Sequence, residues 1–343
     1  MKKTMKILVI GNGFDLQHGL QTRYTDFLNF CQSIIRVNKH ESKDDDELIY
    51  HTFMHSHPEQ YEELNKLLDS FWIKYFIMYR RIMGDKWVAF EKEIENVVTG
   101  LYSDAEVARK NGTDNGFISN QSWKKYPLTS AKTYSEAYEM LARDLKKLNR
   151  ALEIYLSCQA CKKMDSSKKM GLIERLKPDK LLSFNYTSTY FDYYCPKRSI
   201  DSEFIHGIAE RSGSAAECRL ILGYDDHYNN SEAVLDLVPF EKYYQRIVNR
   251  TGANYLKWLE ECDEDGDVLD KTVYFYGHSM SPADGAVLKT LICAPKTSTV
   301  IFYRDGHEDE RAEMIKNLAV VLQPEELIQR TGEKEGTIIF RKI

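Results

Sequence analysis

Two polar side chains in the second half of the sequence have the right chemistry for catalysis. Asn185 follows the apolar run 181–184, and His206 directly follows the run 203–205. An asparagine amide both donates and accepts hydrogen bonds, so it can hold a ribose hydroxyl or an attacking water. A neutral imidazole takes a proton from a hydroxyl or from water near pH 7. Both residues are candidate catalytic groups, although an asparagine that closes its own turn and a structural histidine are the more common cases.

A glycine-rich turn near the start of the chain is a candidate phosphate-binding loop. The apolar run 5–10 is followed by Gly11, Asn12, Gly13, Phe14 and Asp15. Glycines at a strand end let the backbone approach a ligand closely, and the next helix offers free N–H groups to phosphate. The third glycine of the dinucleotide fingerprint is absent, because Leu16 stands at that position. The loop alone leaves nucleotide binding and a plain strand–turn–helix as equal alternatives.

A third polar segment follows the apolar run 272–276 and consists of Gly277, His278 and Ser279. Ser281 and Pro282 then predict the start of a helix, because proline is favoured at the first helical position. "RLIL" predicts one more strand, which ends at Gly223, Tyr224, Asp225 and Asp226. Ligands of open α/β sheets bind at the carboxyl ends of the strands. These segments therefore predict one site at that edge of a sheet.

Short β-rich runs dominate the chain from residue 179 onward. They are "KLLSF", "EFI", "RLILGY", "TVYFYG", "STVIFY" and "GTIIFR". Most are uninterrupted apolar runs, which is typical of a parallel sheet that is covered on both faces. Together with the run 5–10, they predict an α/β fold with a Rossmann-like, mostly parallel sheet of about six strands.

The segment between the first strand and the later ones is predicted to be helical. Apolar residues recur at helical spacing in 24–35, 61–79, 138–155 and from residue 86 onward, with Thr22 as the cap of the first helix. The charged stretch 38–47 and the polar stretch 109–130 are predicted loops. This order indicates a single domain over 1–343, with a mainly helical insertion at 30–178 and the remainder of the sheet at 179–343.

Composition restricts the partners. The 343 residues carry a net charge of −5, so the protein has no overall positive charge that would attract nucleic acid. We therefore expect no nucleic-acid partner. The seven cysteines are odd in number and scattered, which favours a reduced, cytoplasmic protein. No apolar run approaches the ~18 residues of a membrane span, so no membrane partner is expected.

Three further signals have ordinary explanations. Among His51, His55 and His57, two imidazoles could point at a metal from one helix face, but no third ligand from elsewhere is evident, so we expect no metal. "DEDGDVLD" lacks the glycine position and the closing glutamate of a calcium loop, so it is predicted to be a hairpin turn. The aromatic helix 61–79 has more apolar surface than one core face uses, which leaves core packing and a homo-oligomer contact as alternatives.

Several motifs occur in order along nearly the whole chain. They are "IGNGFDL" with "HGL", Thr22-x-Tyr24-x-Asp26-Phe27, Trp87 with Phe90 and Glu91, "SFNYT", His206-Gly207, and Gly277-His278-Ser279. In these motifs the sequence resembles the bacteriophage abortive infection AbiH family. The resemblance implies a role in defence against phage, by arresting or killing the infected cell, with a phage-derived trigger as a further partner.

The same order of motifs resembles, more distantly, the sirtuin-like NAD-binding fold. This resemblance implies that the loop Gly11–Asn12–Gly13–Phe14–Asp15 meets the phosphates and ribose of NAD, and that Gly277, His278 and Ser279 hold its adenosine side. It implies that Asn185 and His206 flank the nicotinamide ribose, where the bond is cleaved. Sirtuin deacylases carry two Cys-x-x-Cys pairs for zinc, whereas this chain has only Cys158 and Cys161, so protein deacylation is disfavoured.

Two functions remain from this reasoning. One is an NAD glycohydrolase-type effector, a hydrolase that breaks the nicotinamide–ribose bond through an oxocarbenium-like state. The alternative is a non-catalytic module that senses a small nucleotide ligand, NAD or ADP-ribose, and signals to a partner. A nuclease is disfavoured, because the chain is acidic and has no basic stripe.

Overall fold

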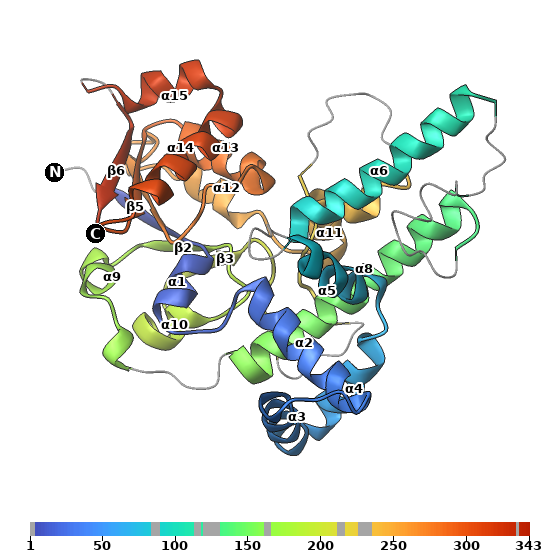
Figure 1. Cartoon of the computed structure of the whole chain (residues 1–343). Coiled ribbons are helices and arrows are strands. Elements are labelled where there is room, and N and C mark those ends of the chain that lie inside the picture. The colour runs from blue at the N-terminus through green and yellow to red at the C-terminus, as the bar shows by residue number, and fades with distance from the viewer. Residues whose placement is uncertain are drawn as a thin grey trace. The chain divides into compact units, whose positions relative to one another are not determined.

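A computed structural model describes residues 4–83, 90–112, 118, 131–160, 166–210, 217–225, 235–333 and 336–343. The chain forms two compact units. The first comprises Met1–Gln21, Cys161–Ile208 and Arg250–Ile343, and the second comprises Thr22–Ala160 and Ala209–Asn249. The first unit contains the sheet, and the second is mainly helical (Figure 1).

Within the described residues of the first unit, six parallel strands form one sheet in the order β3-β2-β1-β4-β5-β6. The strands are β1 (Met5–Ile10), β2 (Lys180–Ser183), β3 (Asp201–Phe204), β4 (Lys271–Tyr276), β5 (Thr297–Tyr303) and β6 (Ile338–Lys342). The predicted α/β class and Rossmann-like parallel sheet are confirmed, because this order is that of doubly wound dinucleotide-binding folds. The order reverses between β1 and β4, which is the position where such sheets open a crevice.

Both faces of the sheet are buried. Ile7 and Val9 lie in one apolar core, whereas Leu8 and Ile10 lie in the other. The first face is covered by α12 (Asn254–Leu259), α13 (Gly285–Cys293), α14 (Glu308–Leu322) and α15 (Pro324–Thr331). The second face is covered by α1 (Asn12–Gln17), α9 (Gly171–Leu176) and α10 (Thr189–Tyr194) (Figure 1). Strands that are buried on two faces have no solvated side to carry polar residues, which explains their continuous apolar sequence.

The second unit is a group of helices around an aromatic core. Its elements are α2 (Tyr24–Asn38), α3 (Asp44–Ser56), α4 (Pro58–Leu67), α5 (Phe71–Met83), α6 (Phe90–Lys110), α8 (Tyr134–Tyr155), the π-helical turn η2 (Leu156–Ala160), the 3₁₀ turn η4 (Val238–Phe240) and α11 (Lys242–Asn249). Trp72, Phe76 and Phe90 are fully buried there. Much of the aromatic surface of 61–79 is therefore used inside the unit.

The prediction of a single helix over 61–79 is wrong, because the segment forms two helices, α4 and α5, with a turn between them. Asp144 of α8 accepts the backbone N–H of Phe71 at 2.6 Å, and its backbone carbonyl accepts the Ser70 hydroxyl at 3.1 Å. A carboxylate that accepts the first free N–H groups starts a helix in the same way as a local cap. Here the cap comes from a residue distant in sequence, which local periodicity does not reveal.

Two other helix expectations also need correction. The stretch 38–47 is not all loop, since α3 begins at Asp44, where acidic residues favour a helix N-terminus. Asp46 there accepts the Ser33 hydroxyl at 2.6 Å. Thr22 is not the cap of α2, because Arg23 precedes the helix and its N–H donates to the Asp26 carboxylate at 3.1 Å.

The segment "RLILGY" is not a strand of the sheet, and it lies in the second unit. Side-chain amides bind part of its backbone, and Tyr224 makes an isolated parallel bridge with Glu241. Asn149 donates to the Leu220 carbonyl at 2.9 Å, and Gln245 exchanges hydrogen bonds of 3.1 and 3.0 Å with Leu222. Gly223, Tyr224 and Asp225 are therefore not at a strand end of the sheet, and Asp226 lies outside the described residues.

Other expectations have simpler outcomes. The hairpin turn in "DEDGDVLD" is confirmed, because Cys262 and Val268 form an antiparallel bridge. Most of the predicted loop 109–130 lies outside the described residues, as do Trp87 and Cys161.

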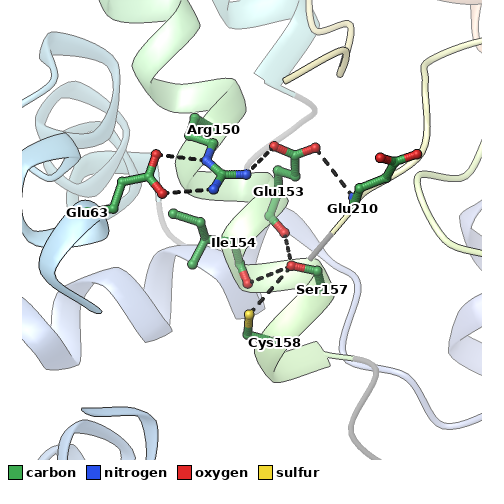
Figure 2. Close-up of polar contacts among 7 residues, drawn as sticks. All are labelled: Glu63, Arg150, Glu153, Ile154, Ser157, Cys158 and Glu210. Carbon is green, nitrogen blue, oxygen red and sulfur yellow. Dashed lines mark hydrogen bonds and ion pairs between the residues drawn. The ribbon is translucent and has the colours of Figure 1, made fainter. Parts of the chain in front are cut away.

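A buried ion cluster joins three segments of the second unit. The Arg150 guanidinium donates to both carboxylate oxygens of Glu63, at 2.9 and 2.8 Å, and to Glu153 at 2.6 Å. The other oxygen of Glu153 accepts the backbone N–H of Glu210 at 3.4 Å (Figure 2). Arg150 is only 1% exposed, so its charge is compensated by two carboxylates inside the unit.

Candidate functional site

Polar residues lie just beyond the carboxyl ends of four neighbouring strands in the first unit. Asp15 lies in α1 after β1, Asn185 follows β2, His206 follows β3 and His278 follows β4. Their exposed fractions are 1%, 4%, 5% and 4%, respectively. Because the strands are parallel, residues far apart in the sequence reach the same edge of the sheet.

Asp15 is held by two threonines that follow β2. Its Oδ2 accepts the Thr187 hydroxyl at 2.6 Å, and the Thr187 and Thr189 hydroxyl oxygens lie 2.8 Å apart. Burial raises the pKa of Asp15 to about 6, although these hydroxyls and the Asn185 amide lower it in part. A carboxyl group that titrates near pH 6 is suited to acid–base chemistry, and above that pH it supplies a buried negative charge.

Asn185 presents an unusual buried amide. Its backbone is fixed, because its N–H donates to the Ser183 hydroxyl oxygen at 3.1 Å. Its side-chain Oδ1 and Nδ2 are buried and make no aligned hydrogen bond among the described residues, although the amide lies near enough to the Asp15 carboxylate to lower its pKa. Oδ1 of Asp15 likewise makes no aligned hydrogen bond there. Buried polar atoms are rarely left unpaired, since each one lowers stability by about 1–3 kcal/mol. Such a group at a sheet edge is typical of a place where a ligand completes the hydrogen bonds.

Asp284 brings the two histidines together. Nε2 of His206 lies 3.0 Å from its Oδ1, and Nε2 of His278 lies 3.4 Å from its Oδ2. The first contact is off the direction of an aligned bond, so Nε2 of His206 has no hydrogen-bond partner among the described residues. The Phe184 ring makes edge contacts with both imidazoles, with centroid distances of 5.5 Å to His206 and 4.4 Å to His278.

The glycines of the first loop are in close backbone contact with the loop after β4. A Cβ atom on Gly11 would lie 2.7 Å from the His278 Cα, and one on Gly13 would lie 2.8 Å from the Gly277 Cα. Gly277 itself has φ +65°, where side chains are strained. These positions need glycine because two turns meet there, whatever the loop binds.

The N–H groups of this loop already have backbone acceptors. Gly11 donates to the Tyr276 carbonyl at 3.1 Å, Gly13 to the Gly277 carbonyl at 2.8 Å and Phe14 to the Gly11 carbonyl at 2.8 Å. The Phe14 ring lies in the apolar core on the second face of the sheet, together with Leu8 and Ile10. A phosphate cradle built from these three N–H groups would therefore have to exchange existing hydrogen bonds.

The other predicted binding residues are placed as follows. Asn12 is exposed at the start of α1. The backbone carbonyl of Ser279 accepts a hydrogen bond from the Asn317 amide at 2.9 Å, which ties the loop to α14.

His18 holds α1 in place. One ring nitrogen contacts the Phe14 carbonyl at 2.7 Å and the other contacts the Tyr194 hydroxyl at 2.8 Å. Burial lowers the pKa of His18, which favours the neutral ring. Both nitrogens are engaged within the unit, so His18 supports the loop that carries Asp15.

Glu91 of the second unit is a further buried carboxylate. Its Oε1 accepts the Tyr24 hydroxyl at 2.7 Å, while Oε2 is buried without a hydrogen-bond partner among the described residues. The Tyr24 and Phe90 rings are stacked at 4.1 Å. These three residues, which the family motifs had singled out, form one local cluster.

Among the described residues, no group of three or more His, Cys, Asp or Glu side chains is arranged to hold a metal ion. No helix there is both long and apolar enough to cross a bilayer.

The first unit thus defines a doubly wound α/β protein with a buried acid–base cluster at the carboxyl edge of its sheet. The model of the family described as bacteriophage abortive infection AbiH matches residues 7–304. The chain belongs to this family, which confirms the resemblance, and its role is in phage abortive infection. A search of curated proteins gives no match.

Proposed function

We propose that this chain acts in abortive infection by binding NAD and hydrolysing the bond between nicotinamide and ribose. One observation carries the proposal: among the described residues, buried polar atoms without an aligned hydrogen bond lie at the ends of two adjacent strands, on Asp15 after β1 and Asn185 after β2. His206 follows the next strand, β3, and its Nε2 faces Asp284 at 3.0 Å.

The chemistry of these atoms fits a sugar better than a metal or an apolar ligand. The Asn185 amide offers one acceptor and two donors, whereas Oδ1 of Asp15 only accepts. A ribose presents adjacent hydroxyls, and each hydroxyl both donates and accepts. Two hydroxyls therefore complete the hydrogen bonds of both side chains, which neither a cation nor an aliphatic group does.

The charges of the site suit cleavage of an N-glycosidic bond. As nicotinamide leaves with the bonding electron pair, positive charge develops on the ribose. The Asp15 carboxylate, ionised above pH 6, stabilises that charge in a site of low dielectric constant. Asn185 holds the ribose or the attacking water, and His206 accepts the proton that the water releases when its oxygen bonds to the sugar. The products are nicotinamide, ADP-ribose and a proton.

The proposal does not depend on a phosphate cradle at the first loop. The backbone acceptors of Gly11, Gly13 and Phe14 make that loop a rigid support for Asp15. Contacts of the loop with phosphate, and of Gly277, His278 and Ser279 with the adenosine side, belong to the same proposal and rest on the remote sirtuin-like resemblance.

The test is release of nicotinamide from NAD by the purified full-length protein. We expect wild-type protein to release nicotinamide, and Asn185→Ala and His206→Ala to lose on the order of 10²-fold or more in rate. Asn65→Ala and His55→Ala are matched controls, because both side chains are exposed in the second unit, and they retain the wild-type rate.

Two results would replace this proposal. Saturable binding of NAD or ADP-ribose without release would indicate the sensing module instead. In cells challenged with phage, full toxicity of both Asn185→Ala and His206→Ala would exclude the mechanism, including the case in which the enzyme acts only after a trigger.

A further inference from the structure

We propose that Asp284 is a positioning residue that fixes which nitrogen of His206 takes the proton. This inference rests on the proposed function for its kinetic consequence, but its structural part is measurable without turnover. Asp284 ends the 3₁₀ turn η5 (Pro282–Asp284), and its side chain is only 12% exposed. The carboxylate faces His206 with one oxygen and His278 with the other.

Asp284 follows β4 in the sequence but contacts His206, which follows β3, and two strands separate β3 from β4. β3 and β4 are separated by β2 and β1, so their ends are about 14 Å apart at ~4.8 Å per strand. The segment after β4 must turn back over the carboxyl edge to meet His206. Gly277 and Met280 make that turn with φ of 65° and 57°. A left-handed methionine is uncommon and indicates that the surrounding contacts determine this path.

The returning segment is held at both ends. The Ser281 hydroxyl oxygen accepts the Ala283 N–H at 3.2 Å, and the Ser279 carbonyl accepts the Asn317 amide at 2.9 Å. Asp284 then leads directly into α13, whose residues Leu288 and Leu291 are fully buried. Its carboxylate is therefore presented by a fixed backbone rather than by a mobile surface loop.

His278 provides an internal comparison for His206. The Met280 N–H donates to Nδ1 of His278 at 3.0 Å, so the proton of that ring is on Nε2, facing Asp284. Among the described residues, His206 has no second hydrogen-bonding contact of this kind. Asp284 is therefore the group that places the proton of His206 on Nε2.

The consequence for the reaction follows from this placement. With Nε2 protonated and facing Asp284, Nδ1 of His206 has a free lone pair and is the nitrogen that accepts the proton from water. The carboxylate then stabilises the imidazolium that forms. The Nε2–Oδ1 separation is already that of a hydrogen bond, so a rotation of the ring is enough to align it.

The direct test is the ¹⁵N spectrum of the histidine rings in the full-length protein at high pH, with His206→Gln and His278→Gln used to assign the signals. In wild-type protein we expect His206 to show a protonated Nε2 and a bare Nδ1. In Asp284→Ala the two resonances of His206 move toward each other as both tautomers become populated, while those of His278 stay in place because the Met280 N–H remains. Asp284→Asn, which keeps an acceptor, retains the wild-type pattern.

Two spectroscopic results would overturn the proposal. Unchanged His206 resonances in Asp284→Ala would mean that Asp284 does not set the tautomer. Equal movement of His206 and His278 would mean that Asp284 only supports the loop.

A kinetic measurement separates this inference from the proposed function. If the protein releases nicotinamide, Asp284→Ala lowers kcat on the order of 10²-fold with KM for NAD within about two-fold. A raised KM with unchanged kcat would contradict the positioning role. If wild-type protein releases no nicotinamide, the proposed function fails, while the spectra still decide whether Asp284 positions His206.

Discussion

Two buried polar clusters, one in each unit, are paired in opposite ways. In the second unit, the Arg150 guanidinium is matched by the Glu63 and Glu153 carboxylates, and every contact is an aligned hydrogen bond of 2.6–2.9 Å (Figure 2). In the first unit, Asp15, Asn185 and His206 are equally buried but keep side-chain atoms without a hydrogen-bond partner among the described residues. Burial alone therefore does not separate these two clusters, whereas the pairing of their buried atoms does.

This difference has an energetic meaning. A paired buried ion cluster stabilises its unit only as long as all members are present, because removal of one leaves an uncompensated charge. Unpaired buried groups destabilise the free protein, and their removal relieves that cost. Mutations in the two regions should thus change the free energy of unfolding in opposite directions.

The largest effect is expected for Arg150→Met. It leaves the Glu153 carboxylate buried without its cation, which should lower the free energy of unfolding by about 3–5 kcal/mol. Urea denaturation followed by circular dichroism measures the change. Arg143→Met is the control, because Arg143 is 65% exposed and lies 3.8 Å from Asp144. A loss below 1 kcal/mol would mean that the cluster does not stabilise the unit.

Asp15→Asn should stabilise the protein, and only above acidic pH. The carboxyl group has a pKa of about 6 when folded and 3.8 otherwise, so the folded chain binds the proton more tightly. The free energy of unfolding of the wild-type protein should therefore decrease as the pH rises from about 4 to 6, and the contribution of Asp15 should be constant above pH 6. The variant should gain roughly 3 kcal/mol at pH 7.5, as about two pKa units correspond to 1.36 kcal/mol each. At pH 3.5 the two proteins should unfold alike; a pH-independent difference would contradict the raised pKa.

A smaller effect is expected for Asn185→Leu. Replacement of an unpartnered buried amide by an apolar side chain of similar size should change the free energy of unfolding by between zero and a gain of about 1 kcal/mol. Thermal unfolding with and without ADP-ribose measures this. A loss above 2 kcal/mol would show that the amide is satisfied in the free protein and that the contrast between the two clusters does not hold.

The strands and the strand-end residues were predictable because their signals are local. Continuous apolar runs such as 5–10 and 272–276 mark doubly buried parallel strands, and parallel strands bring their ends to one edge. Asn185 and His206 were therefore found as strand-end residues. Their chemistry remains a proposal.

Other features could not be read from local patterns. Asp284 looks like part of a helix start, and its contact with His206 arises only because the loop returns across two strands. The segment "RLILGY" does not join the sheet, and the amides of Asn149 and Gln245 bind the backbone of its residues Leu220 and Leu222. The break before Phe71 depends on Asp144, which is distant in sequence. In each case the deciding partner is a side chain from another segment.

The most direct measurement of the central claim is a calorimetric titration of ADP-ribose, which carries the ribose but is not cleaved. We expect saturable binding to wild-type protein and to Asn65→Ala, and a loss of about ten-fold or more in affinity for Asn185→Ala, since one such hydrogen-bonded group contributes about 1.4 kcal/mol. Equal affinity of Asn185→Ala and wild-type protein, or no binding to either, would contradict the assignment of the unpaired groups to a ribose-containing ligand.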